Sequence, residues 1–481
     1  MRSVLLLATG AILLLGAAGA WQLGRLREGP DLPGGERLLA GLSSPVEVRW
    51  DSLGVPHVWA ETLEDAVFAQ GWLHARDRLW QMELFGRVLE GRLSELFGER
   101  TLPSDRFLRT VGLARAAEGT VASLDPETRR VLEAYAAGVD AAVDGWEGPL
   151  PPEFVLLRAR PEPWSVRRVV GMEKIMAWDL AEYGETLSLA LARRALDDAG
   201  WGHVRPRYPD WGPVIVEDPD RSAGVEDAPP APRSFLPSDP ALLVGARIPD
   251  PARAFLSRGS VVRASNAWVV GGERSRSGRP ILANDMHLGL DAPTLWYLIA
   301  LHAPGLDVVG MSLPGAPGIV AGRTRGVAWG FTNGSVDDSD FFVERADSAD
   351  PSRYLTPGGS APFAVRTEVI RVRGRGEDTL RVRSTRHGPV ITPVEPRAGS
   401  ELLAFRWVGH EPSTTAAAIL AMNRARTARE FVRALSRFSN PHQNVVFADT
   451  AGAFGYWLAG RVPLRAGGRV PLLPVPGWTG E

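Results

Sequence analysis

Ser265-Asn266-Ala267-Trp268-Val269-Val270-Gly271-Gly272 is a serine-led apolar run in the middle of a chain of 481 residues. The polar segment Arg274-Ser275-Arg276-Ser277-Gly278 follows it and leads into a second run at 279–285. Two such runs around a short turn predict a β-hairpin. A cut before Ser265 would free an α-amine with an ordinary pKa of about 7.7–8.0, which can take the proton of the serine hydroxyl. One residue would then supply both nucleophile and base.

The hairpin also predicts which residues meet. In an antiparallel pair, opposite residues have a constant index sum, and a turn centred near Arg276 gives a sum of about 552. Ser265 is therefore expected opposite about His287.

Composition limits the classes of protein that this chain can represent. It is 44 % hydrophobic and 23 % charged, which is typical of a folded protein with a large core. The net charge of −2 gives no reason to expect nucleic acid or an anionic membrane surface as partner. The absence of cysteine excludes a thiol nucleophile, thiolate metal sites and disulfides.

The N-terminus predicts export. Arg2 precedes an apolar run from Val4 to Trp21, and Ala18-Gly19-Ala20 is a small-residue site of the kind that a signal peptidase accepts. The first interpretation of residues 1–20 is a signal peptide, with the protein periplasmic or secreted. The alternative is a membrane anchor with the rest of the chain facing outward, because the run approaches the length that spans a bilayer.

The first 200 residues are expected to be mainly helical after a short strand pair at 46–50 and 57–59. Helical spacing of apolar residues covers 63–91, 111–124, 126–142 and 166–198, and Asp125 with Pro126 suits the start of the third segment. Residues 204–255 are rich in Pro, Asp, Ala and Arg without a sustained period, which is typical of an exposed linker.

From Val262 onward the pattern indicates β structure. Helical patches are expected at 293–302 and 413–436, and the strands mostly follow one another directly, which favours an α+β fold over a doubly wound parallel one. The expected strands are 267–271, 280–284, 306–311, 318–321, 327–332, 340–344, 364–373, 378–383, 402–408, 443–448 and 453–458.

Several motifs together make the chain resemble the penicillin acylase family of N-terminal-nucleophile amidohydrolases. The likeness runs from about Val46 to Glu481, apart from about 205–263, and its specificity lies in the order and spacing of the motifs. They are Gly54-Val55-Pro56-His57, Ala75-Arg76-Asp77-Arg78-Leu79-Trp80-Gln81-Met82, Gly91-Arg92-Leu93-Ser94-Glu95-Leu96-Phe97-Gly98, Ser265-Asn266-Ala267-Trp268, Ala283-Asn284-Asp285-Met286-His287-Leu288-Gly289, Leu313-Pro314-Gly315 and Trp329-Gly330-Phe331-Thr332-Asn333.

The resemblance implies a four-layer αββα sandwich made as one precursor. Autocatalytic cleavage at Ala264–Ser265, through an N→O acyl shift, would leave two chains that stay associated. The implied division is a signal or anchor at 1–20, a mainly helical light chain at 21–204, a spacer at 205–264 and the start of the heavy chain at 265–481. The chain stops within a family motif that normally leads on, so a C-terminal portion is expected to be missing.

The resemblance also implies catalytic roles. Ser265 matches the nucleophile, and His287 matches a position that holds the Ser265 amine or hydroxyl through a backbone or ring hydrogen bond. Asn333 matches the residue whose backbone N–H is half of the oxyanion hole. The second donor in the family is an asparagine side chain further along, and it has no match before Glu481.

Substrate and metal contacts follow from the same resemblance. Met176 and Leu180 match a light-chain helix that lines the acyl pocket, and their spacing of four puts them on one helix face. A structural Ca²⁺ tying light to heavy chain is implied, with no organic cofactor. Its implied ligands are Glu185, Asp337, the Ser339 carbonyl, Asp340 and the Pro471 carbonyl.

The expected function is an exported amidohydrolase that cleaves N-acylated small molecules of the penicillin or acyl-homoserine-lactone kind. Patterns for a Gly-x-Ser-x-Gly elbow, a His-Glu-x-x-His zinc helix, a Walker loop and a dinucleotide fold are absent from the sequence. One alternative is a Ser265, His287 and Asp285 hydrolase that needs no chain cleavage. Another is a catalytically inactive secreted relative that acts as a binding protein.

Overall fold

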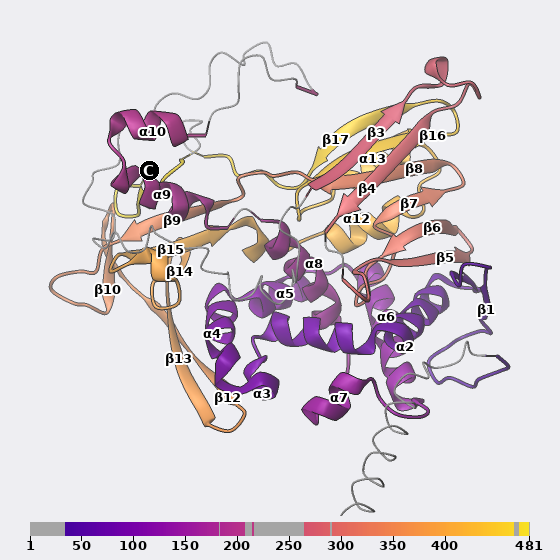
Figure 1. Cartoon of the computed structure of the whole chain (residues 1–481), viewed down its shortest axis with the longest axis horizontal. Coiled ribbons are helices and arrows are strands. Elements are labelled where there is room, and N and C mark those ends of the chain that lie inside the picture. Colours follow the sequence, from indigo (N-terminus) through magenta and orange to yellow (C-terminus); the bar gives the residue numbers. More distant parts are fainter. Residues whose placement is uncertain are drawn as a thin grey trace, which may run out of the picture.

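The computed structural model describes residues 34–181, 183–206, 214–215, 264–288, 291–465 and 471–480 (Figure 1). The signal or anchor expected at 1–20 and most of the spacer expected at 205–264 lie outside these residues. Among the helices of the described part, none combines the length and the apolar character needed to cross a membrane.

The chain enters through the expected strand pair, β1 (Glu47–Trp50) and β2 (Pro56–Trp59). The Asp51 carboxylate accepts hydrogen bonds from the main-chain N–H groups of Leu53 and Val55 and so closes the turn between them. The long helix α2 (Leu63–Glu90) begins where Thr62 accepts from the N–H of Asp65, and it ends at Gly91 with φ 58°. These are the standard signals of a helix start and stop.

The helical part is confirmed, with different boundaries. The expected helix at 111–124 is divided at Gly112, whose φ of 86° ends one helix and begins the next. The expected 166–198 segment breaks at 181–184, where Gly184 has φ 88°. Asp125 caps α6 as predicted, accepting from the N–H of Thr128. The helices are α3 (Ser94–Phe97), α4 (Leu102–Val111), α5 (Leu113–Ala122), α6 (Pro126–Asp144), α7 (Pro152–Leu157), α8 (Val166–Leu180), α9 (Glu185–Ala195) and α10 (Asp198–Val204).

An eight-stranded sheet in the order β1-β2-β5-β6-β7-β8-β16-β17 forms the centre of the β part. Its pairs are antiparallel except β2 with β5, which is parallel. The other strands are β5 (Tyr297–Ala303), β6 (Leu306–Ser312), β7 (Ala321–Thr324), β8 (Val327–Asn333), β16 (Gln443–Asp449) and β17 (Phe454–Ala459). The helix expected at 293–302 was therefore wrong, because an apolar run buried inside a sheet has no alternation to separate it from a buried helix.

Helices cover one face of this sheet. The predicted helical patch at 413–436 forms α12 (Thr415–Met422) and α13 (Ala428–Leu435). The ring of Phe431 lies 5.3 Å from that of Trp329, and the ring of Phe438 lies 5.9 Å from that of Phe331. Together with Ala66 and Leu73 of α2, these side chains belong to one buried core.

The serine-led hairpin, β3 (Ala264–Val270) and β4 (Ile281–His287), lies against the opposite face of the sheet (Figure 1). Gly330 points toward it, since the flanking Trp329 and Phe331 side chains point to the helices. A Cβ added at Gly330 would lie 2.5 Å from the Cβ of Asn284, so glycine permits this approach. The described residues thus form helices, a large sheet and a hairpin layer, a mixed α and β arrangement.

A second β region lies beside the helices (Figure 1). It is held on α4 by a small core of Leu102, Ile370, Val372, Leu380 and Val382. Its strands are β9 (Ser339–Glu344), β10 (Arg353–Thr356), β11 (Gly359–Pro362), β12 (Ala364–Val372), β13 (Gly376–Thr385), β14 (Gly388–Pro389), β15 (Leu402–Trp407) and β18 (Val475–Pro476).

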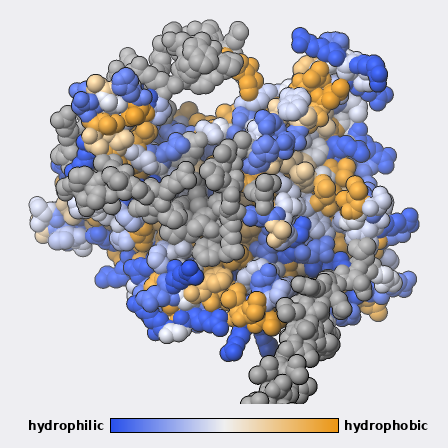
Figure 2. All heavy atoms as spheres, in the orientation of Figure 1, coloured by the Kyte–Doolittle hydropathy of each residue, from blue (hydrophilic) through white to orange (hydrophobic). Residues whose placement is uncertain are grey.

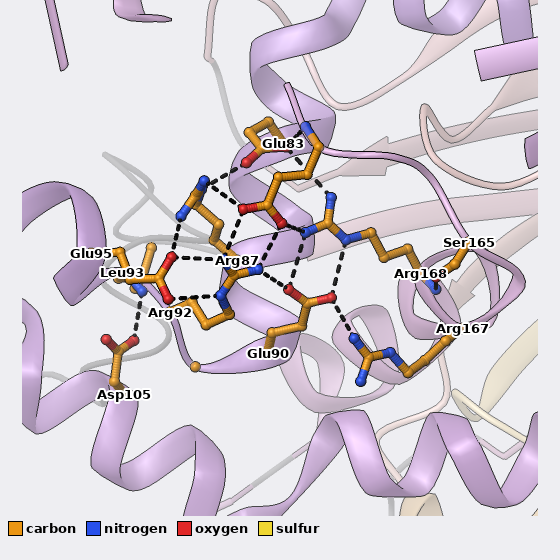
Figure 3. Close-up of polar contacts among 12 residues, drawn as sticks. Glu83, Arg87, Glu90, Arg92, Leu93, Glu95, Asp105, Ser165, Arg167 and Arg168 are labelled. Atoms are coloured by element: carbon orange, nitrogen blue, oxygen red, sulfur yellow. Dashed lines mark hydrogen bonds and ion pairs between the residues drawn. The ribbon is translucent and has the colours of Figure 1, made fainter. Parts of the chain in front are cut away.

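Ion pairs hold the start of α8 to the end of α2 (Figure 3). The Arg168 side chain is 3 % exposed and donates to Glu90 at 3.0 Å and to Glu162 at 2.7 Å. Arg87, also buried, donates to Glu83 at 2.7 Å. Because charges so far from water require partners, the network fixes the position of α8.

The surface is mixed, with apolar groups scattered among polar ones (Figure 2). Apolar surface is visible over the β3–β4 hairpin, to which the half-exposed Trp268 and Ile281 belong.

Candidate active site

Ser265 lies near the start of β3, directly opposite Met286 of β4. The expected partner was about His287, so the register differs from the prediction by one residue. Residues opposite each other in an antiparallel pair have side chains on the same face. Ser265 and Met286 are both half-buried, and both side chains line the same pocket.

His287 is on the other face of the hairpin. It pairs with Ala264, and strand alternation turns its side chain away from the face that carries Ser265 and Met286. Its Nε2 lies 2.7 Å from an Asp285 oxygen, and the two side chains are 45 % and 67 % exposed. The structure thus joins His287 to Asp285 but does not bring the imidazole to Ser265. A role for His287 beside Ser265 can only come from its main chain.

Asn333 ends β8, and its main-chain N–H points toward the hairpin. Gly334 donates to the carbonyl of His442 in the neighbouring segment, so the N–H groups of residues 332 and 334 face β16. Because alternate peptide groups of a strand face opposite sides, those of 331 and 333 face the other edge. The Phe331 N–H indeed donates to the Asn284 side chain at 3.1 Å.

Asn284 fastens the hairpin to that edge. Its Nδ2 donates to the carbonyls of Phe331 at 2.9 Å and Asn266 at 3.1 Å, while its Oδ1 accepts from Phe331. β7 pairs only with Trp329 and Ala328 of β8, so the side-chain amide takes the place of a strand beyond them. The hairpin and the end of β8 therefore form one unit.

The pocket beside this unit is mostly apolar, with about 110 Å³ available to the centres of water-sized molecules. Met176 and Leu180 of α8 line it, as predicted for the acyl site, together with Ser265 and Asn333. The Asn333 Nδ2 donates to the Leu180 carbonyl at 3.1 Å, which ties α8 to β8 at the mouth of the site. The other apolar lining residues include Val170, Leu288, Trp296, Val320, Ile419 and Phe438.

One wall of the pocket, the loop after β6, is held from behind by buried polar side chains. The Tyr135 hydroxyl accepts from the Gly315 N–H at 2.8 Å, and Gln70 bonds both main-chain groups of Gly318. His74 bridges Tyr135 and Ser312 at 2.7 and 2.9 Å. Burial lowers the pKa of His74 to about 3, so it is neutral at pH 7. The wall is therefore fixed by uncharged hydrogen bonds.

Two polar side chains in the pocket were missed by the sequence analysis. Glu173 lies one turn before Met176 on α8, and Gln443 is the register partner of Asn333. Both carry a buried polar atom without a hydrogen-bond partner among the described residues, Glu173 Oε1 and Gln443 Nε2. Glu173 left one signal in the sequence, a carboxylate on the face of a helix that otherwise presents apolar residues.

Burial raises the pKa of the Glu173 carboxyl, and the neighbouring Lys174 ammonium opposes that rise. Burial likewise lowers the pKa of Lys174, whose side chain is fully enclosed. Glu173 Oε1 and Lys174 Nζ are 3.6 Å apart, beyond a hydrogen bond.

The residues expected to bind Ca²⁺ are arranged around an arginine. Arg465 Nε lies 3.0 Å from an Asp340 oxygen, and its Nη2 lies 3.3 Å from an Asp337 oxygen. Ser339 begins β9, Glu185 begins α9, and Pro471 opens the last described segment. No group of three or more His, Asp or Glu side chains in the described segments is arranged to hold a metal ion. This arrangement does not fit a calcium ion, because a guanidinium already takes the cation's place.

Comparison with known proteins gives a consistent family. A family model described as penicillin amidase matches residues 45–481. The chain is 31% identical to the acyl-homoserine lactone acylase QuiP of Pseudomonas aeruginosa, over 98% of this chain and 56% of that protein. It is 32% identical to the penicillin acylase 2 proenzyme of Pseudomonas sp. (strain SE83), over 93% of this chain and 56% of that protein.

More distant similarities agree. Identity to the penicillin G acylase of Escherichia coli is 28%, over 90% of this chain and 56% of that protein. A solved thermostable penicillin G acylase from Alcaligenes faecalis, in orthorhombic form, superposes with a TM-score of 0.41 at 26% identity, covering 45% of this chain and 39% of that one. The chain spans about half the length of the curated relatives it matches.

Proposed function

Because the chain belongs to the penicillin amidase family, we propose that it hydrolyses the amide bond of N-acylated small molecules through an acyl-enzyme on Ser265. The observation that carries the proposal is that Ser265 and Asn333 line one largely apolar pocket. The substrates are of the penicillin or acyl-homoserine-lactone kind, in line with the names of the relatives.

Maturation comes first in this proposal. The Ser265 hydroxyl attacks the Ala264 carbonyl, the peptide C–N bond breaks, and an ester to Ser265 forms with a free α-amine. Water then hydrolyses the ester, leaving a carboxylate on Ala264 and the hydroxyl on Ser265. Light and heavy chains remain together, and the heavy chain completes a four-layer αββα sandwich.

Catalysis uses the new terminus. The α-amine of Ser265 takes the hydroxyl proton as the oxygen attacks the substrate amide carbon, and the amine product leaves with that proton. The Asn333 N–H, which points to the hairpin edge, donates to the oxyanion; one such donor contributes about 2.7–4 kcal/mol in measured cases. Water then releases the acid from Ser265. The His287 main chain, beside Ala264 in the register, positions the amine.

Met176 and Leu180 receive the acyl group in this scheme, and their apolar side chains select an apolar chain. We further propose that the protein is exported. The apolar N-terminal run of the sequence supports that step.

The proposal is tested by replacing Ser265 with alanine. Denaturing gels should show that wild-type protein divides into two chains, the heavy one starting Ser-Asn-Ala-Trp on Edman sequencing. Ser265→Ala should remain one chain and release no amine from N-acyl substrates. Ser277→Ala, in the exposed turn of the same hairpin, serves as control and should divide normally.

Other outcomes separate the alternatives. Normal division of the Ser265→Ala protein would refute the proposed nucleophile. An undivided wild-type chain that still hydrolyses amides would favour a serine hydrolase without maturation, and an undivided inactive chain would favour a binding protein.

A further inference from the structure

We propose that Glu173 is a specificity residue of the acyl pocket, and that the preferred acyl group carries a hydroxyl at the end remote from the amide. This inference rests on the proposed amide hydrolysis, and it adds the chemistry of the acyl chain.

The first argument is that Glu173 stands alone in the pocket. It is the one ionisable side chain among the residues that line it in the described part of the chain. The side chain is only 10 % exposed, and its Oε1 has no hydrogen-bond partner among the described residues. An unsatisfied buried acceptor is costly, so a ligand that brings a donor to this atom gains affinity that a plain alkyl chain does not.

The second argument is its place along the pocket. Glu173, Met176 and Leu180 follow a spacing of three and four, which puts them on one face of α8. At about 1.5 Å per residue, Glu173 lies about 10 Å from Leu180 along the helix axis. Leu180 is at the Asn333 end of the pocket. An acyl chain attached at Ser265 must therefore extend past about two helical turns before its end meets Glu173.

The third argument concerns charge. Lys174 is the only lysine of the chain; its buried ammonium donates to the Glu411 carbonyl at 3.0 Å and lies 3.6 Å from Glu173 Oε1. The charge of a Glu173 carboxylate is thus already balanced. An acyl chain ending in an ammonium would leave an extra charge in apolar surroundings, whereas a hydroxyl supplies the missing hydrogen bond and no charge.

The test compares three amides of one amine, with decanoyl, ω-hydroxydecanoyl and ω-methoxydecanoyl groups. The methoxy group has the oxygen of the hydroxyl but no donor. Wild-type kcat/KM should favour the hydroxy chain over the methoxy chain by about tenfold or more, the usual effect of a hydrogen bond to a charged group. Equal values for these two in the wild-type protein would overturn the inference, and so would a preference for an ω-aminodecanoyl chain.

Variants sharpen the comparison. Glu173→Leu should abolish the preference for the hydroxy chain, while Glu173→Gln, which keeps an acceptor oxygen, should retain part of it. Met176→Leu reshapes the same wall without touching the carboxylate and should leave the ratio between hydroxy and methoxy chains unchanged. A Glu173→Leu protein that keeps the wild-type ratio would contradict the role of Glu173.

A separate measurement distinguishes failure of this inference from failure of the proposed function. If none of the amides is hydrolysed, the proposed activity fails. Calorimetric binding of free decanoic, ω-hydroxydecanoic and ω-methoxydecanoic acids to the wild-type protein still decides the inference. Tighter binding of the hydroxy acid supports it, and equal binding of all three overturns it.

Discussion

The side-chain amide of Asn333 donates a hydrogen bond of 3.1 Å to the main-chain carbonyl of Leu180. This contact joins the last residue of α8 to the last residue of β8, two elements far apart in the sequence. It sets the acyl pocket wall and the proposed oxyanion donor at a fixed separation. The site is therefore assembled from a helix before the presumed cleavage point and a strand after it.

Asn333→Ala should separate the two roles of this residue. The variant keeps the main-chain N–H but loses the link to Leu180, so the donor is less well positioned. We expect kcat to fall by up to about tenfold with a loss of about 1 kcal/mol in unfolding free energy. Kinetics and urea unfolding measure both. The control is Asn266→Ala, an exposed asparagine whose carbonyl, not its side chain, is used. An unchanged kcat in Asn333→Ala would contradict the link.

Asn284→Ala should loosen the hairpin. It leaves the N–H and carbonyl of Phe331 without their partner, at a cost of about 1–3 kcal/mol. Hydrogen exchange at the Phe331 amide should become faster, and hairpin-dependent chain division should slow. Asp285→Ala, an exposed neighbour on the other face of the same strand, is the matched control. Equal exchange rates in the two variants would argue against the clamp.

The network around Arg168 predicts an acid-sensitive step. Hydrogen bonds from Arg92, together with the nearby arginines, lower the pKa of Glu162 from 4.5 to about 2, although burial opposes this. A lowered pKa in the folded state gives stability that is present above the unfolded value and is lost as pH falls through the folded one. Wild-type protein should therefore lose stability between pH 4.5 and about 2.

Glu162→Gln tests that step. The variant should be less stable than wild type at pH 7, and this difference should shrink toward pH 2. Thermal unfolding at pH 7, 4 and 2.5 measures it. Glu61→Gln, at an exposed position, is the control. A difference between wild type and Glu162→Gln that is the same at every pH would exclude the linkage.

Metal removal tests the role of Arg465. Because its guanidinium already balances Asp337 and Asp340, EDTA or added Ca²⁺ should leave the wild-type Tm unchanged. Arg465→Ala leaves the two carboxylates without it, so its Tm should be lower and should rise when Ca²⁺ is added. A wild-type Tm that falls in EDTA would mean that calcium displaces Arg465.

Local signals were enough to predict many elements. The capped start at Asp125, the strand pair around Asp51 and the alternating β runs depend on neighbours in the sequence, and all three were confirmed. The run at 293–302 was not interpretable in this way. Its strand, β5, is buried by α2 and by strands on both sides, and burial removes the alternation that distinguishes strand from helix.

The candidate site shows the same division. Met176 and Leu180 could be placed on one face of a helix from spacing alone, and the structure puts both in the pocket. The direction of His287 could not be predicted, because a register shift of one residue moves a side chain to the other face of the hairpin. Arg465 between Asp337 and Asp340 was also invisible, since it lies more than a hundred residues away in the sequence.

The sequence by itself determined the family, the mixed helix and strand content and the serine at the head of a hairpin, because motif order, periodicity and turn residues are local properties. Only the tertiary structure decided that Ser265 faces an apolar pocket, that His287 faces solvent and that Glu173 is enclosed beside Lys174. Those facts depend on strand register and on which helix packs against which sheet edge. Such choices are made by long-range burial and hydrogen bonding, and no window of neighbouring residues contains them.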